Sequence, residues 1–153
     1  MQEAISQITL DHIFDEEISL TAITEYGISW GDIAGGKAEI PLNGARFDIS
    51  FEGKLTGGKI NGVIKGTDFL EIRADGKFML DIRAAIITDD GEIIAVKEDG
   101  VSAPGPDGTA RLNLNMHFST ISSKYSWLNI KQGWLIGEVD MIKGKVKMKG
   151  YIN

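Results

Sequence analysis

Hydrophobic and polar residues alternate one by one along several stretches of this chain. Residues 46–52 read RFDISFE, with Phe and Ile on one face and Asp and Ser on the other. Residues 111–118 repeat the pattern with Leu, Met and Phe against Arg, Asn and His, and Lys recurs at every second position of 143–149. Successive side chains of a strand point to opposite faces, whereas the 3.6-residue period of a helix would mix the two sets. These stretches are therefore predicted to be β-strands.

Short turn sequences separate the predicted strands. Asp90-Gly91 lies between the apolar segments 77–88 and 92–99, and Ala74–Lys77 precedes the first of them. Asp-Gly pairs favour tight hairpins because Gly adopts the positive φ angle that such turns need. We therefore expect adjacent antiparallel strands on both sides of each turn.

The turn signals divide the chain into about eight strands, a number that closes a small antiparallel barrel. No helix of three turns is predicted, and Tyr125–Ile130 is expected to hold at most a short turn. The prediction is an all-β protein: residues 1–153 form a single domain, a closed or nearly closed antiparallel β-barrel.

Composition supports this fold and narrows the chemistry. The chain has 22 Ile and 19 Gly against 3 Pro, which suits strands separated by tight turns. Sixteen basic and 22 acidic residues give a net charge of −6, which argues against a nucleic-acid partner. The chain has no Cys and only two His, too few for a typical zinc site. The adjacent acids Asp89 and Asp90 before Gly91 suit a tight turn better than a calcium-binding loop. We therefore expect no metal site and no cofactor.

The sequence also predicts the cellular location of the protein. The first ten residues lack the basic and long apolar segments of a signal peptide. The longest unbroken apolar runs have four residues, whereas a membrane helix needs about 20. We therefore expect a cytoplasmic protein without a membrane partner.

Several short motifs lie in the segment from Gly58 to Gly100 and in a later aromatic stretch. They are G-x-D-[WF]-L at 66–70, R-x-D-G at 73–76, L-D-x-R at 80–83, T-D-D-G-x-x-I at 88–94, F-x-T at 118–120 and Y-x-W-L-N at 125–129. In this order the motifs resemble a family of small bacterial proteins recorded as a domain of unknown function. The resemblance implies a barrel similar to the allene-oxide-cyclase and lipocalin-like architectures, and it implies no activity and no catalytic residues.

One group of candidate site residues consists of charges on neighbouring predicted strands. Asp81 and Arg83 share a face that is otherwise apolar, and an unpaired buried charge is costly. Glu71 and Arg73 share one face of the preceding strand and could join them across the ladder. Two interpretations stay open: a structural ion-pair network, or an anion-binding arginine cluster with a carboxylate base inside the barrel.

A second group combines amides, a histidine and aromatic residues. His117 and Asn115 lie on a polar strand face that suits either solvent or a polar lumen. Tyr125, Trp127 and Asn129 share one face if their segment is extended. Such a wall is typical of pockets for apolar small molecules, and packing in the core explains Trp127 equally well.

Three functions are compatible with these residues. The favoured hypothesis is a barrel that binds a small hydrophobic or amphipathic ligand, apolar with an anionic or carbonyl group. The alternative is a cofactor-independent isomerase, cyclase or lyase, with Asp81 or Glu71 as base, Tyr125 or His117 as acid, and an arginine of the same strands holding a carboxylate or enolate. The third is a structural domain without a ligand that assembles as a homodimer.

Overall fold

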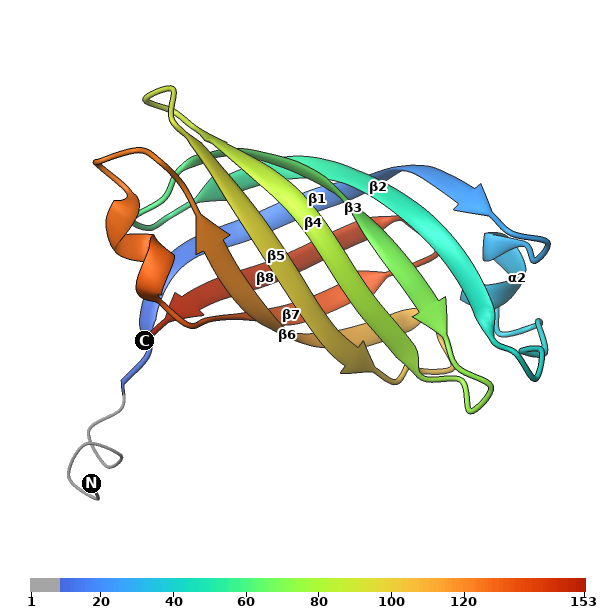
Figure 1. Cartoon of the computed structure of the whole chain (residues 1–153). Helices are drawn as coiled ribbons and strands as arrows, with labels where there is room; N and C mark the ends of the chain where they lie inside the picture. Colours follow the sequence, from blue (N-terminus) through green and yellow to red (C-terminus); the bar gives the residue numbers. More distant parts are fainter. Residues whose placement is uncertain (1–8) are drawn as a thin grey trace, which may run out of the picture.

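Eight antiparallel strands form one closed barrel in the computed structural model, which describes residues 9–153 (Figure 1). Each strand pairs with the next along the chain, and β8 pairs with β1 to close the barrel. The predicted fold class is confirmed. The expectation about a signal peptide concerns mainly the first eight residues, which lie outside the described part of the chain. The strands are β1 (Asp11–Glu25), β2 (Ala45–Thr56), β3 (Gly62–Ile72), β4 (Phe78–Thr88), β5 (Ile93–Ser102), β6 (Thr109–Ser119), β7 (Gly133–Asp140) and β8 (Lys145–Ile152).

Two short helices mark the opposite ends of the barrel (Figure 1). The α-helix α2 (Trp30–Ala34) lies between β1 and β2, and the 3-10 helix η1 (Ser126–Ile130) lies between β6 and β7. We call these the α2 end and the η1 end. Within residues 9–153, neither of these helices has the length and hydrophobicity that crossing a membrane requires.

The predicted hairpin turns are present. Gly91 and Gly76 have φ angles of 87° and 84°, which residues with a Cβ rarely adopt. The N–H of Gly91 donates to the carbonyl oxygen of Thr88, and the N–H of Gly76 donates to that of Arg73. These turns fix β3, β4 and β5 as consecutive antiparallel neighbours.

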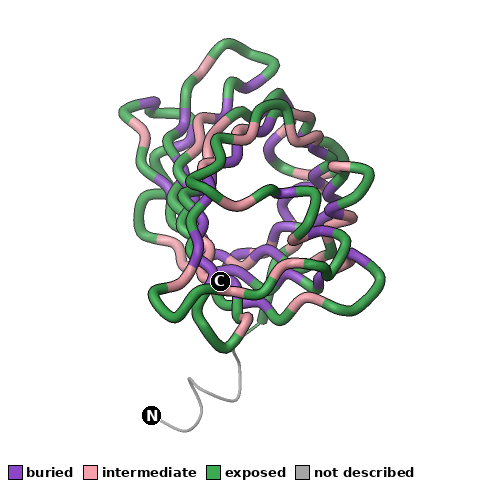
Figure 2. Tube along the Cα trace, turned by 90° about the vertical axis from the view of Figure 1, so that its right-hand side faces the viewer, coloured by how far each residue is buried: buried purple, intermediate pink, exposed green. Residues whose placement is uncertain are grey.

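The apolar faces of the strands point into the barrel and form the core. Phe47, Ile49 and Phe51 of β2 are buried, and buried and exposed residues alternate in the same way along β6 and β8. Figure 2 shows buried and exposed positions interspersed along the chain around the barrel. The core has one cluster toward each end, and Trp30 from α2 packs into the cluster at the α2 end. The Lys face of β8 points outward, as a row of charged side chains requires.

Candidate functional site in the barrel interior

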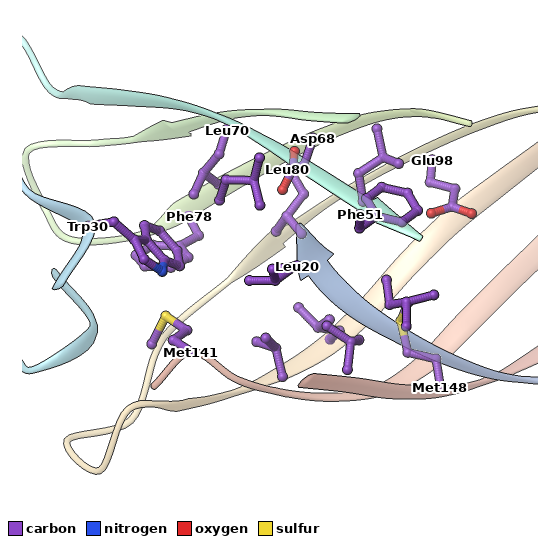
Figure 3. Close-up of a pocket in the computed structure, with 16 residues that line it drawn as sticks. Leu20, Trp30, Phe51, Asp68, Leu70, Phe78, Leu80, Glu98, Met141 and Met148 are labelled. Atoms are coloured by element: carbon purple, nitrogen blue, oxygen red, sulfur yellow. The ribbon is translucent and has the colours of Figure 1, made fainter. Parts of the chain in front are cut away.

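A cavity of about 60 Å³ lies inside the barrel and extends toward the α2 end (Figure 3). A single water molecule needs about 10–15 Å³ of cavity volume. The cavity therefore admits a few waters or a compact organic molecule. Its wall is largely apolar and includes Leu20, Trp30, Leu70, Phe78, Leu80 and Met141.

Two carboxyl groups interrupt this apolar wall (Figure 3). Asp68 of β3 and Glu98 of β5 both align with Ile82 of β4, one from each side, so they lie at the same level of the barrel. Asp68 is 8% exposed and Glu98 is 2% exposed. The backbone N–H of Asp81 donates to Asp68 Oδ1 at 3.0 Å, whereas Glu98 Oε2 is buried and has no hydrogen-bond partner among the described residues.

A third carboxyl group enters the interior from the opposite side. Glu16 of β1 is 2% exposed, and neither of its carboxyl oxygens has a hydrogen-bond partner in the part of the chain that the structure describes. In the closed order of eight strands β1 and β5 are diametrically opposed, so Glu16 and Glu98 project from facing walls. Ile18, two residues after Glu16, and Met148, its partner on β8, both line the cavity.

Burial in the barrel interior favours the protonated form of all three acids. Burial raises the pKa of Glu16 and the pKa of Asp68 to about 7 each, the latter against the opposing effect of the Asp81 N–H. Burial, followed by the negative charges of Glu16 and Asp68, raises the pKa of Glu98 well above its usual range. Every buried charged side chain among residues 9–153 is one of these acids, and no Lys or Arg there is buried. The interior is therefore an acidic site in apolar surroundings.

Asp81 and Arg83 lie on the outside of the barrel. More than half of each side chain is exposed, and Arg83 Nε lies 4.0 Å from Asp81 Oδ1. The cavity is lined by Phe78, Leu80 and Ile82, on the other face of β4. The expectation that the charged face of this strand points inward is wrong, and the contact is a surface ion pair of low energetic value.

Glu71 and Arg73 also face solvent and do not join Asp81 and Arg83. Glu71 pairs with Arg46 of the neighbouring strand. Arg73 binds Asp75 within its own hairpin turn, with Nε 3.1 Å from Asp75 Oδ1. The predicted network across the two strands is absent from the part of the chain that the structure describes.

The polar face that carries His117 and Asn115 meets solvent, the first of the two predicted alternatives. His117 Nε2 lies 2.9 Å from Gln132 Oε1, and Asn115 Nδ2 donates to Asp99 Oδ1 at 2.9 Å. Both side chains are exposed. Their contacts join β6 to neighbouring segments on the outer surface, away from the cavity.

Tyr125, Trp127 and Asn129 do not share a strand face, because their segment forms η1. Tyr125 is buried and its hydroxyl donates to Asp90 Oδ1 at 3.0 Å, while Trp127 is 36% exposed. Asn129 accepts from the N–H of Thr120 and donates to its carbonyl oxygen. These residues fasten η1 to the barrel end, and they lie at the opposite end from the cavity.

Replacing Tyr125 with Phe tests this structural role. The substitution keeps the buried ring and removes the hydrogen bond to Asp90, so we expect the free energy of unfolding to fall by about 1 kcal/mol. Urea denaturation measures the change. Asn129→Ala breaks the neighbouring contacts of η1 and serves as a comparison. An unchanged midpoint for Tyr125→Phe would mean that the hydroxyl contributes nothing to holding the 3-10 helix.

The sequence interpretation missed the three interior acids, although two of them carry a readable signal. Asp68 alternates with apolar Ile64, Leu70 and Ile72, and Glu98 follows Ile94 and Val96 at the same spacing. Asp68 is also the acidic residue of the G-x-D-[WF]-L motif.

The run Asp15-Glu16-Glu17 taken alone is most simply interpreted as a solvated acidic face, and for Glu16 this interpretation is wrong because its side chain is buried. Its neighbour Glu17 is exposed, and Lys147 Nζ lies 3.8 Å from Glu17 Oε1. Alternation along β1 therefore separates two adjacent glutamates, one inside the barrel and one outside.

Comparison with known proteins agrees with this fold. A family described as "Protein of unknown function (DUF3237)" matches residues 8–152. The chain belongs to the DUF3237 family. A UPF0311 protein of Clostridium acetobutylicum is 29% identical over 133 residues, which cover 75% of this chain and 78% of that protein. The predicted resemblance to a bacterial family of unknown function is thereby confirmed.

Solved structures share the DUF3237 barrel at low sequence identity. A C. acetobutylicum protein with unknown function superimposes with a TM-score of 0.78 at 23% identity, covering 95% of this chain and 99% of its own. A β-barrel-like protein of Acinetobacter baumannii gives 0.76 at 22%, covering 94% of both chains. A protein of Penicillium herquei described as an enzyme gives 0.69 at 21%, covering 95% of this chain and 94% of its own. These similarities establish the fold alone.

Proposed function

We propose that this DUF3237 protein binds a small, mostly apolar molecule in the barrel cavity, with protonated Asp68 as the hydrogen-bond donor. The observation that carries the proposal is that Asp68 lies, with Glu98, on a cavity wall whose other lining residues are apolar. Its Oδ1 accepts the Asp81 N–H, which leaves Oδ2 to carry the proton and donate to a ligand oxygen. Pockets for small molecules typically combine apolar walls with a few such polar groups.

The acidic interior supports one part of the ligand predicted from the sequence and opposes the other. Because its pKa is about 7, the Asp68 carboxyl group keeps its proton in mildly acidic solution and can donate a hydrogen bond to a neutral carbonyl oxygen. An anionic group would lie among three carboxyl groups with no buried Lys or Arg within residues 9–153 to compensate its charge. We therefore propose a carbonyl or similar neutral acceptor in the ligand, and no anionic group.

Butanone is a suitable probe because its five non-hydrogen atoms match a cavity of about 60 Å³. Methyl chemical shifts of Leu and Ile residues, recorded during a butanone titration, report binding and its location. We expect binding to the wild type at pH 6 and about tenfold weaker binding at pH 8, because Asp68 loses its proton around pH 7.

Two substitutions of Asp68 distinguish the effect of its proton on binding from the effect of its side-chain shape. Asp68→Asn keeps an oxygen for the Asp81 N–H and adds a donor that does not titrate, so butanone should bind it equally at pH 6 and pH 8. Asp68→Leu removes the donor and should bind butanone at pH 6 about as weakly as the wild type binds it at pH 8. Asp81→Asn changes an exposed carboxyl and leaves the backbone donor intact, so it should behave as the wild type. Shifts confined to the outer surface, or no binding at all, would refute the proposal.

A second candidate function is proton-transfer catalysis without a cofactor. It is favoured by the second carboxyl, Glu98, on the same cavity wall and by the pKa of Asp68, since general bases work best with a pKa close to the ambient pH. Glu98, whose pKa is raised well above its usual range and which therefore keeps its proton, would protonate a carbonyl oxygen, while ionised Asp68 removes a proton from the adjacent carbon, giving an enol. The described enzyme of P. herquei shares the barrel and adds no residue assignment.

Exchange of the α-protons of butanone in D₂O, followed by ¹H NMR, tests this second function. Catalysis predicts exchange faster than in buffer, and its loss in Asp68→Asn, which binds butanone but has no carboxylate to remove the α-proton. Binding of butanone without accelerated exchange would leave the binding function and exclude catalysis of enolisation.

A further inference from the structure

We propose that the facing carboxyl groups of Glu16 and Glu98 form a subsite for an ammonium group, so that the ligand class of this barrel is compact apolar amines. The inference rests on the proposed binding function and adds to it a second point of recognition. Asp68 would contact a neutral acceptor, and the Glu16–Glu98 pair would contact the positively charged end of the same ligand.

The first observation is that both acids lack the partners that buried carboxyl groups normally have. Within residues 9–153, the two carboxyl oxygens of Glu16 and Oε2 of Glu98 make no hydrogen bond, although both residues are only 2% exposed. Buried polar side-chain atoms are nearly always hydrogen-bonded, because an unpaired one loses its interactions with water and gains nothing in return. The pair therefore needs a donor from outside the protein.

The chain itself supplies no cation for this position. All Lys and Arg side chains of residues 9–153 lie outside the buried interior, and the nearest basic row, on β8, points to solvent. The same residues contain no group of three or more His, Cys, Asp or Glu side chains arranged to hold a metal ion. A donor that approaches two carboxyl groups from between them fits better than a metal that needs closely converging ligands.

The position of the pair connects it to the cavity. Glu98 is itself part of the cavity wall, and Ile18 and Met148 beside Glu16 line it as well. A primary ammonium group has three N–H donors, so it can bond carboxyl oxygens on opposite walls at once. Its alkyl chain would then lie along the apolar wall formed by Leu20 and Leu80 (Figure 3). An amine meets both the charge and the apolar character of this interior.

Butylamine, butanone and butyrate, which have closely similar sizes, distinguish the outcomes in methyl NMR titrations at pH 8. We expect butylamine to bind at least about tenfold more tightly than butanone, since hydrogen bonds between charged groups exceed neutral ones by this amount or more. Butyrate should not bind. The preference for butylamine should disappear in the double variant Glu16→Gln/Glu98→Gln.

The matched control is Glu17→Gln/Asp99→Asn, which removes the same charge from the adjacent, outward-facing positions. It should keep the full preference for butylamine. An equal loss in both double variants, or equal binding of butylamine and butanone to the wild type, would overturn the ammonium subsite and leave the proposed function standing. Failure of all three probes to bind would instead refute the proposed function. If the double Gln variant does not fold, Glu98→Gln alone must reduce the preference.

Discussion

Raising the pH from 5 to 8 is expected to lower the free energy of unfolding of this DUF3237 protein by an amount on the order of 3–5 kcal/mol. Glu16, Asp68 and Glu98 cause this effect because their pKa values are raised in the folded barrel. In the unfolded chain these carboxyl groups lose their protons around pH 4. In the barrel Glu16 and Asp68 keep them up to about pH 7.

Between these two pH values the folded state binds more protons than the unfolded state. Each such group therefore makes stability fall as the pH rises, by at most about 1.4 kcal/mol per pH unit. Exposed acids act in the opposite sense: hydrogen bonds from Lys124 and Arg73 lower the pKa of Asp90 and Asp75, and the stability they contribute is lost only as the pH falls below about 4. The protein should therefore be most stable in mildly acidic solution.

Urea denaturation at pH 5, 6, 7 and 8 measures this dependence. Glu98→Gln replaces the most perturbed acid with a neutral amide of the same shape, so the variant should be more stable than the wild type at pH 8 and differ little at pH 5. Glu17→Gln changes an exposed acid and should reproduce the wild-type curve. Stability that is constant or rises between pH 5 and pH 8 would mean that the interior acids are hydrated or paired.

The fold was predictable because its determinants are local. Alternation along β2 and β6 and the Asp90-Gly91 turn each specify strand or hairpin without reference to the rest of the chain. Closure of the sheet follows from the number of strands. The locations of the turns and the all-β class could therefore be predicted from the sequence.

The site was not predictable because it depends on which face of each strand points inward. On β4 both faces are largely apolar, so the pattern did not decide between Leu80 and Asp81 for the interior. On β1 the register with β8 shifts between His12 and Phe14, and Ile13 and Phe14 are both buried, so strict alternation does not hold there. An unpaired acid such as Glu16 is also expected outside a core, and only the closed barrel places it inside.

Phe47→Ala is expected to cost about 3–5 kcal/mol of stability, the usual range for removing a fully buried aromatic ring. Phe47 is completely buried at the α2 end, and the ring of Trp30 packs edge-on against it with centroids 5.2 Å apart and planes at 72°. Phe69→Ala is the control, because this residue lies on the neighbouring strand β3 and is 44% exposed. It should change stability by less than about 1 kcal/mol in the same urea measurement.

The same substitution tests how the cavity limits ligand size. Trp30 is part of the cavity wall and is held by Phe47, so removing the Phe ring enlarges the space at the α2 end and frees the indole to move. Cyclohexanone, which is larger than butanone, should therefore bind Phe47→Ala at pH 6 and bind the wild type and Phe69→Ala much more weakly. Equally tight binding of cyclohexanone to all three proteins would show that packing of Phe47 against Trp30 does not set the size limit.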